Sequence, residues 1–504
     1  MKQKRIQPVS ALLPPKHPPP QQSHEARPLC DLKARTARGG IAVMMRQFGV
    51  HGLNALGAAI LARLVTPEVY GVYALVVFLM VFLSVFGGTG LASNLIRLER
   101  EPTDLDRGCV FLAQGAIVLA LSAALTLTAP ELAAWYHLQI SSGTWLFRLV
   151  GLSLLVTSFQ VMPQITLERD LRFGVIAAIE TSQSLAFNAT AIVLAWRGLG
   201  ATAFGVALAT RAILGAVASN IASPTQAAPK WNWPITREHL TYGLYFQGVN
   251  AISLIKEAIN PIFIGAVVSM AAVGYANWGM FLAGGAVIAL NGLQRVFLPA
   301  FALATASAAT LQSLAERAIQ AVNAIAAPIM AFSLVFIRPI THTVFGDKWL
   351  AAIPLFYLFW LGDLLTPTTT VLLALLNAVG RARTTFRLAA FWLTVTWLLG
   401  IPLIYRQGAM GFAIASFVAG STGAVVFPLA KRTCHIRIAR TALPPWAIAA
   451  ATCAIVGALL GPTTADSTHR LALAAVEFTA LYGAALAFVF RRSVRSIATA
   501  LRVR

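Results

Sequence analysis

The sequence predicts an all-α membrane protein with about 14 transmembrane helices: two six-helix lobes plus two extra C-terminal helices, and both termini cytoplasmic. Hydrophobic residues make up 58% of the 504 residues and charged residues only 11%, whereas a soluble domain carries about a quarter charged residues. The mean hydropathy is +0.72. Apolar runs of about 20 residues recur, and such runs cross a bilayer as helices because lipid offers the backbone no hydrogen-bond partner.

The predicted spans follow each other with short loops, and their boundaries hold to within a few residues. Prolines Pro354 and Pro367 are expected to kink the long tenth span. The spans are 40–63, 70–96, 108–128, 144–167, 173–196, 201–222, 242–269, 274–304, 314–337, 349–379, 384–405, 409–430, 444–462 and 470–490.

Lysine and arginine residues set the orientation, because cytoplasmic loops carry more of them than outer loops do. With the N-terminus inside, the cytoplasmic segments exceed the outer ones by about four to one. The outer cations are Arg63, Arg148, Arg197, Arg338, Lys348, Arg406 and Arg470. Both termini of this multi-pass chain are therefore expected in the cytoplasm.

Composition divides the chain into six segments. Residues 1–38 are basic and Pro-rich without a long apolar run, so we expect a disordered cytoplasmic tail and no cleavable signal peptide. The others are an N-lobe of spans one to six at 39–222, a cytoplasmic linker at 223–241, a C-lobe of spans seven to twelve at 242–430, spans thirteen and fourteen at 431–490, and a basic cytoplasmic tail at 491–504.

The turns after spans one and seven carry similar sequences. LARLVTPEVYGVYAL occupies 61–75 and IGAVVSMAAVGYANW occupies 264–278. In each, an apolar helix end is followed by a tight turn and a glycine, Gly71 or Gly274, with an aromatic residue close by. This pattern predicts two parallel repeats with a binding site at their interface. Chance similarity between apolar segments is the alternative.

The placement of basic residues and the absence of several motifs argue against a number of function classes. The net charge of +21 does not indicate nucleic-acid binding, because the basic residues lie at the ends of apolar segments. The four cysteines are far apart and form no CxxC pattern, so we expect no disulfide framework and no metal site. Phosphate-binding GxxxxGK[ST] and catalytic HExxH or GxSxG motifs are missing. We expect no cofactor and no ATP hydrolysis by a P-loop.

Six motifs follow one another along the chain: ARLVTPEVYGVYAL at 62–75, GGTGLASNLIR at 87–97, AVGYA at 272–276, LQRVFLPAF at 293–301, FGDKW at 345–349 and NAVGRAR at 377–383. They resemble landmarks of the polysaccharide and oligosaccharide flippases, which carry lipid-linked repeat units. This family belongs to the same MATE-like superfamily as the multidrug antiporters and the peptidoglycan lipid flippase. The likeness covers about residues 39–440, and its specificity comes from the order of the motifs on successive helices.

Ionisable residues inside predicted spans are costly and normally face a cavity or a partner. They are Arg46, Glu180, Arg211, Lys256, Glu257, Arg295, Asp363 and Glu477. The resemblance places spans one, seven and eight against a central cavity. Arg46, Lys256, Arg295 and Arg211 are therefore the candidates for binding a substrate diphosphate, because guanidinium and ammonium groups form charge-assisted hydrogen bonds with phosphate.

Each candidate also has a structural explanation. Arg46 and Arg295 could instead reach the headgroups by snorkelling, and Arg211 could form a structural ion pair with Glu180. Asp363, Glu257 and Glu180 are the candidates for proton or cation coupling, although Asp363 could be a structural carboxyl. Members of the family often carry an unpaired acid in span seven. Here Glu257 stands beside Lys256, which weakens that role.

The resemblance implies a flippase, not an enzyme. It would move undecaprenyl-diphosphate-linked oligosaccharide repeat units from the cytoplasmic to the periplasmic leaflet by alternating access, for exopolysaccharide, O-antigen or capsule biosynthesis. The implied partners are the lipid-linked oligosaccharide, membrane lipids and polysaccharide polymerase or chain-length proteins.

Three other readings remain. A multidrug or cation antiporter of the same fold needs acidic residues, but span one carries Arg46 and no Asp or Glu. A membrane-embedded glycosyltransferase or polymerase commonly has a large outer loop, whereas the longest one here, at about 129–143, holds Glu131, His137 and little else. A passive scaffold would not require buried cations.

Overall fold

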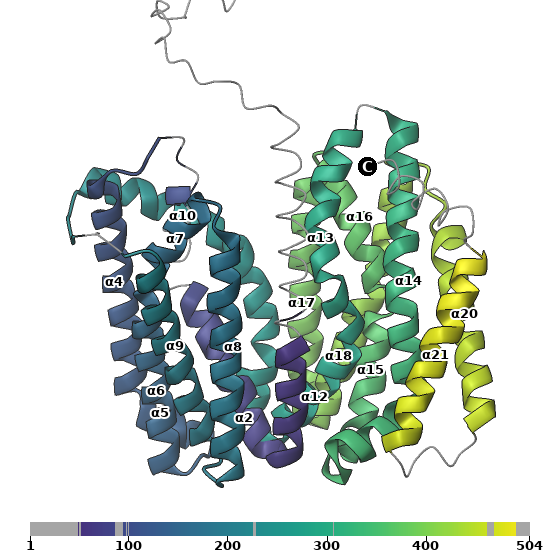
Figure 1. Cartoon of the computed structure of the whole chain (residues 1–504), viewed down its shortest axis with the longest axis horizontal. Helices are drawn as coiled ribbons and strands as arrows, with labels where there is room; N and C mark the ends of the chain where they lie inside the picture. Colours follow the sequence, from purple (N-terminus) through teal and green to yellow (C-terminus); the bar gives the residue numbers. More distant parts are fainter. Residues whose placement is uncertain are drawn as a thin grey trace, which may run out of the picture.

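The computed structural model describes residues 49, 52–85, 94–96, 98, 100–224, 228–305, 307–460 and 468–489, and every regular element within these ranges is a helix. Ten segments of this described part are long and apolar enough to cross a membrane. The protein is therefore an all-helical, multi-pass membrane protein. The figures show its helices running side by side in two groups, drawn in blue and in green (Figure 1).

The first group, which we call the N-lobe, contains most helices before residue 223. In it, α6 packs against α4 and α9, and α9 packs against α8. Its members are the helix Gly52–Leu64, α2 (Pro67–Ser84), α4 (Asp104–Leu127), α5 (Ala129–Trp135), α6 (Ile140–Ser158), α7 (Val161–Arg169), α8 (Phe173–Trp196) and α9 (Thr202–Ala222).

The second group, the C-lobe, repeats this order of contacts. Here α15 packs against α18, α18 against α17, and α16 against α14. Its members are α12 (Met270–Ala283), α13 (Gly285–Ala304), α14 (Ala308–Ile340), the π-helix η4 (Thr341–Phe345), the 3-10 helix η5 (Asp347–Ala352), α15 (Ile353–Asp363), α16 (Thr366–Ala378), α17 (Ala382–Gln407), α18 (Ala409–Ser421), η6 (Thr422–Val425) and α19 (Val426–Lys431).

Helix α10 (Trp233–Glu257) connects the lobes. It begins inside the segment expected to be a linker, because the Asn232 side chain accepts a hydrogen bond from the Ile235 backbone and Pro234 occupies the first turn. It contacts α4 of the N-lobe and α17 of the C-lobe. It continues into the π-helix η3 (Ile259–Ile264) and the short α11 (Gly265–Val267).

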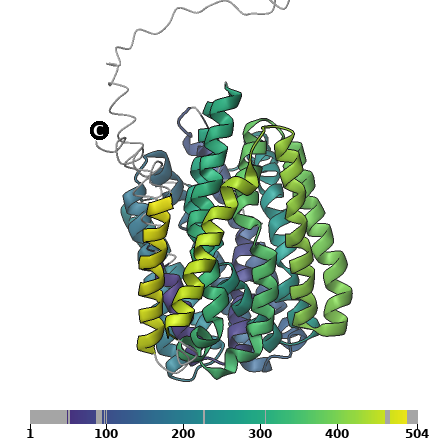
Figure 2. The ribbon, with the colours of Figure 1, turned by 90° about the vertical axis from the view of Figure 1, so that its right-hand side faces the viewer.

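Two further helices, α20 (Ile438–Leu460) and α21 (Thr468–Val489), pack on the outer side of α14 (Figure 2). Trp446 Nε1 of α20 donates a hydrogen bond to Asn323 Oδ1 at 2.9 Å. The Tyr482 hydroxyl of α21 donates to the Ala324 carbonyl, also at 2.9 Å. These bonds satisfy polar groups that would otherwise face lipid unpaired, so they fix both helices to the C-lobe.

The predicted tenth span is interrupted. Pro354 and Pro367, the two expected kink positions, lie in the first turns of α15 and α16. Proline is tolerated there because the first backbone amides of a helix have no intrahelical partner. The interruption leaves Asp363 at the last position of α15, where its carboxylate accepts a hydrogen bond from Thr366 Oγ1 at 3.3 Å.

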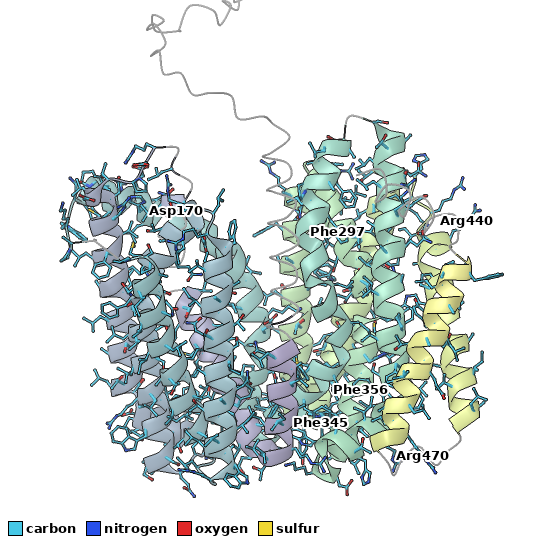
Figure 3. The ribbon with its side chains drawn as sticks, in the orientation of Figure 1. Asp170, Phe297, Phe345, Phe356, Arg440 and Arg470 are labelled. Atoms are coloured by element: carbon cyan, nitrogen blue, oxygen red, sulfur yellow. The ribbon has the colours of Figure 1, made fainter. Side chains whose placement is uncertain are left out.

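The two ends of the bundle differ. We call one the junction end, which carries α5 and η5, and the other the linker end, which carries residues 228–232 and α7. In Figure 3, Phe345 lies at the junction end and Asp170 at the linker end. Exposed tryptophans mark both ends: Trp135, Trp145 and Trp196 near the first, Trp231 and Trp233 near the second. Tryptophan is enriched at membrane–water interfaces, so these side chains indicate the depth of immersion.

Candidate functional site

At the junction end the lobes meet through two equivalent glycines, and α2 and α12 pack closely there. A Cβ atom added to Gly71 would collide with the Met270 carbonyl oxygen, and one added to Gly274 would collide with the Pro67 carbonyl oxygen. Each glycine thus faces the residue four positions before its counterpart. Only glycine permits such close approach of two backbones, so the contact is reciprocal at the level of main-chain atoms.

The beginnings of these two helices match as well. Thr66 accepts a hydrogen bond from the Val69 amide at the start of α2. Ser269 accepts one from the Ala272 amide at the start of α12. In both helices the cap lies five residues before the glycine of the crossing. The similar sequences at 61–75 and 264–278 therefore form similar local structures.

Side chains from one lobe also bind the main chain of the other. Arg63 Nη1 donates to the Thr343 and Val344 carbonyls at 2.5 and 3.2 Å. In return, Lys348 Nζ donates to the Arg63 and Val65 carbonyls at 2.8 and 2.6 Å. Carbonyls at a helix C-terminus have no intrahelical partner and attract cations. The two cations therefore join the lobes by donating to main-chain carbonyls of the opposite lobe.

An aromatic cluster fills the space beside these bonds. Trp349, which is fully buried, donates from Nε1 to the Ala62 carbonyl at 2.9 Å. Its ring stacks on Trp278 at 5.6 Å between centroids and meets the edges of Tyr70 at 5.2 Å and Tyr275 at 6.0 Å. We call these contacts, with the glycine crossing and the two cations, the junction.

Sequence reasoning did not identify this junction. The sequence indicates Arg63 and Lys348 only as loop cations, although FGDKW at 345–349 is among the motifs that carry the resemblance. Nothing in the spacing could show that residues about 285 positions apart share hydrogen bonds. The repeated pattern around Gly71 and Gly274 is the signal in the sequence that points to the junction.

Arg211 lies on α9 of the N-lobe with its side chain exposed. It is within electrostatic range of Glu180 on α8 and of Tyr73 on α2. Tyr73 in turn packs against Phe204 at 4.7 Å and Phe187 at 6.1 Å between ring centroids. The structure therefore brings Arg211 near Glu180, as the sequence suggested, and adds a tyrosine that was not anticipated.

Other polar side chains continue this face of α8. Asn188 Nδ2 donates to Asn54 Oδ1 at 3.0 Å, and Gln183 Nε2 donates to Gln160 Oε1 at 2.9 Å. Glu180, Gln183 and Asn188 recur at helical spacing, so they lie on one side of α8. The N-lobe thus has a row of polar groups joining α8 to its neighbours.

Lys256 of the connecting helix α10 and Asp363 of α15 lie within electrostatic range of each other. Lys256 stands at the end of α10 just before the π-helix, and its side chain is exposed, as is that of Glu257. The end of α10 is fixed because Trp397 Nε1 of α17 donates to the Ile255 carbonyl at 3.0 Å. The cation and the carboxylate of this pair both lie where a helix is interrupted.

Two other predicted cations are not placed by these contacts. Arg46 lies outside the described residues. For Arg295 only the backbone, within α13, is described. A cavity of about 310 Å³ opens instead at the linker end of the N-lobe, lined by Leu95, Glu101, Pro102, Arg107, Met162, Ile165, Thr166, Arg169, Asp170 and Pro224. None of the predicted site residues lines it.

The chain is similar in sequence to known proteins over more than half of its length. The family profile described as "Polysaccharide biosynthesis protein" matches residues 60–354, more than half of the chain. The succinoglycan biosynthesis transport protein ExoT of Rhizobium meliloti (strain 1021) is 23% identical over 391 residues, covering 76% of this chain and 75% of that protein.

Two solved structures are similar in fold. The lipid II flippase MurJ in an inward closed conformation has a TM-score of 0.73 at 14% identity, covering 90% of this chain and all of that one. An inward-facing multidrug resistance MATE family transporter of the MOP superfamily has a TM-score of 0.59 at 15% identity, covering 81% of this chain and 99% of that one. The fold is therefore that of these transporters.

Proposed function

Because the chain belongs to the polysaccharide biosynthesis protein family, we propose that it flips undecaprenyl-diphosphate-linked oligosaccharide repeat units. It moves them from the cytoplasmic to the periplasmic leaflet of a bacterial inner membrane, for exopolysaccharide, O-antigen or capsule biosynthesis. The similarity to a succinoglycan transport protein and to a lipid flippase fold supports this assignment. The chain is a transporter and not an enzyme.

The proposal includes a topology. Fourteen spans cross the membrane, both termini are cytoplasmic, the junction end faces the periplasm and the linker end faces the cytoplasm. The bias of lysine and arginine toward the linker end supports this orientation. Arg440 and Arg470, which lie at opposite ends of the molecule in Figure 3, stand near the starts of the last two spans.

The junction is the observation that carries the mechanism. Matched elements of the two lobes close one end of the bundle through main-chain contacts and a small number of side-chain bonds. Each such bond contributes about 0.5–3 kcal/mol, so the set can form and break during a cycle. Alternating access follows if the junction opens toward the periplasm once substrate has entered from the cytoplasm.

Cations between the lobes receive the diphosphate in this proposal. Lys256 and Arg211 are exposed on the membrane-spanning helices, and Arg46 and Arg295 complete the set. The oligosaccharide and diphosphate enter the space between the lobes while the polyprenyl tail stays in lipid. An anion leaving an inside-negative cell gains about 2.3 kcal/mol per charge per 100 mV, so the membrane potential can drive outward flipping. Asp363, Glu257 and Glu180 are the groups for ion coupling if a gradient drives it.

A reconstituted assay tests the proposal. The purified chain is placed in proteoliposomes with a fluorescent undecaprenyl-diphosphate-linked oligosaccharide, and its appearance in the outer leaflet is followed with and without an imposed potential. Lys256→Ala and Arg211→Ala should each slow flipping about tenfold or more, because a charge-assisted bond to phosphate is lost. Arg197→Ala, an exposed cation at the end of α8, is the matched control.

Three outcomes would contradict parts of this scheme. Flipping that ignores the potential removes the electrogenic account. Full flipping activity of both Lys256→Ala and Arg211→Ala favours a passive scaffold. Transport of a cationic drug against a proton or sodium gradient, without flipping of the lipid-linked oligosaccharide, would identify the multidrug antiporter of the same fold.

A further inference from the structure

The cavity at the linker end of the N-lobe is not part of the transport site described above. Its lining comes from four places in the chain: Leu95 with Glu101 and Pro102, Arg107 at the start of α4, the helix α7 with Asp170 after it, and Pro224 after α9. Met162, Ile165 and Leu95 form a buried apolar floor. Four charged side chains, those of Glu101, Arg107, Arg169 and Asp170, stand around this floor.

The Arg169 guanidinium is occupied by hydrogen bonds to the main chain. Its Nη1 donates to the Leu95, Ile96 and Leu98 carbonyls at 2.5, 3.4 and 3.2 Å, and Nη2 donates to the Arg100 carbonyl at 3.3 Å. A guanidinium group has five N–H donors in a fixed fork, and most of these are used. Arg169 therefore closes one wall of the cavity and offers little to a ligand.

Three other charged side chains line the cavity without such hydrogen bonds. Arg107 is half-buried, while Glu101 and Asp170 are exposed. Among the residues that the structure describes, none of these side chains forms a hydrogen bond or an ion pair. The cavity thus offers one cation and two carboxylates that are free to bind a ligand carrying both signs of charge.

Exposed apolar residues lie close in sequence to the residues that line the cavity. Leu171, next to Asp170, is 70% exposed, and Ile221, three residues before Pro224, is 77% exposed. Leu171 also has a φ of +55°, a left-handed conformation that β-carbon sterics disfavour by about 1–2 kcal/mol. Nearby, the exposed rings of Trp231 and Trp233 stack at 6.1 Å, and Gly108 of α4 approaches Lys230 closely. Exposed apolar side chains next to charged ones are the combination that a lipid molecule can bind, with its acyl chains on the apolar residues and its headgroup on the charges.

We propose that this cavity binds the zwitterionic headgroup of an aminophospholipid. The Arg107 guanidinium binds the phosphate, Glu101 and Asp170 bind the ammonium group, and the acyl chains leave over the apolar rim beside Leu171. A diphosphate does not fit this balance of charge, because two carboxylates face it and Arg169 is occupied. The site is therefore separate from the diphosphate site of the proposed transport function and does not depend on that function.

The experiment uses the full chain, purified in detergent and stripped of lipid. Thermal unfolding and native mass spectrometry are measured with added phosphatidylethanolamine, phosphatidylglycerol or water-soluble phosphoethanolamine. We expect phosphatidylethanolamine to raise the unfolding midpoint and remain bound, whereas phosphatidylglycerol does neither. Binding by phosphoethanolamine alone would show that the headgroup chemistry suffices, and its failure beside successful lipid binding would show that the acyl chains are required.

Variants connect the effect to the cavity. Arg107→Gln, and the double variant Glu101→Gln with Asp170→Asn, should each weaken phosphatidylethanolamine binding about tenfold. Arg237→Gln, an exposed cation elsewhere at the linker end, should bind like the parent. Equal stabilisation by both lipids, or unchanged binding in both cavity variants, overturns the proposal. Arg169 is left intact because its loss would open the wall.

Discussion

The glycine crossing of the junction gives the sharpest prediction. A Cβ at position 71 would lie 2.8 Å from the Met270 carbonyl carbon and 2.9 Å from the Gly274 nitrogen, and one at position 274 would lie 2.8 Å from the Pro67 carbonyl carbon. Carbon atoms in contact normally lie about 3.5–4.0 Å apart. Gly71→Ala and Gly274→Ala should each force α2 and α12 apart by about 1 Å.

This separation raises the free energy of the conformation in which the junction is closed. Overpacking of this kind costs about 1–3 kcal/mol, which corresponds to about a 5- to 150-fold shift of the equilibrium toward an open junction. Because the contact is reciprocal, the two substitutions should act to a similar extent. The shift should also slow flipping, since a cycle needs a closed junction while substrate enters from the other side.

Accessibility of a buried cysteine measures the shift. Ala62, fully buried at the junction, is changed to Cys in a background without other cysteines and labelled with an impermeant maleimide from the periplasmic side. Labelling should be faster in either alanine variant than in the parent. Gly115→Ala in α4 is the matched control, because a Cβ there meets no atom within 4 Å. Labelling and flipping rates equal to the parent in both variants would refute the reasoning.

Two further predictions follow from single contacts. Trp349→Phe keeps most of the ring but removes the Nε1 bond to the Ala62 carbonyl, so it should lower the unfolding free energy by about 1 kcal/mol and increase labelling at position 62; an unchanged denaturation midpoint would show that the bond contributes nothing. Burial lowers the pKa of His239, although Asp106 and Glu238 oppose this. His239 accepts from Asn94 at Nδ1, at 2.9 Å, and protonation would break that bond. A lowered histidine pKa gives stability that is present above the ordinary value of 6.5 and lost as pH falls below it. Thermal unfolding from pH 7.5 to pH 5 should therefore show a loss that His239→Gln reduces; an equal loss in the variant assigns it to other groups.

Much of the fold follows from the sequence because the membrane imposes simple rules. Lipid forces every spanning backbone into helices, so runs of apolar residues already located most helices. Pro354 and Pro367 marked the interruptions of one span because proline lacks an amide hydrogen. The order of six motifs along the chain carried the resemblance to the family, and the similar segments around Gly71 and Gly274 pointed to repeated local structure.

The sequence by itself therefore determined the class of protein and the family, and it located most of the helices that the structure describes. Only the tertiary structure decided that Lys348 bonds to the end of the first helix, that Arg169 is occupied by four carbonyls while Arg107 is not, and that Lys256 lies near Asp363. The physical reason is that hydropathy and capping act between neighbours in the chain. The partner of a charged side chain is set by how helices far apart in sequence pack together, which no local pattern encodes.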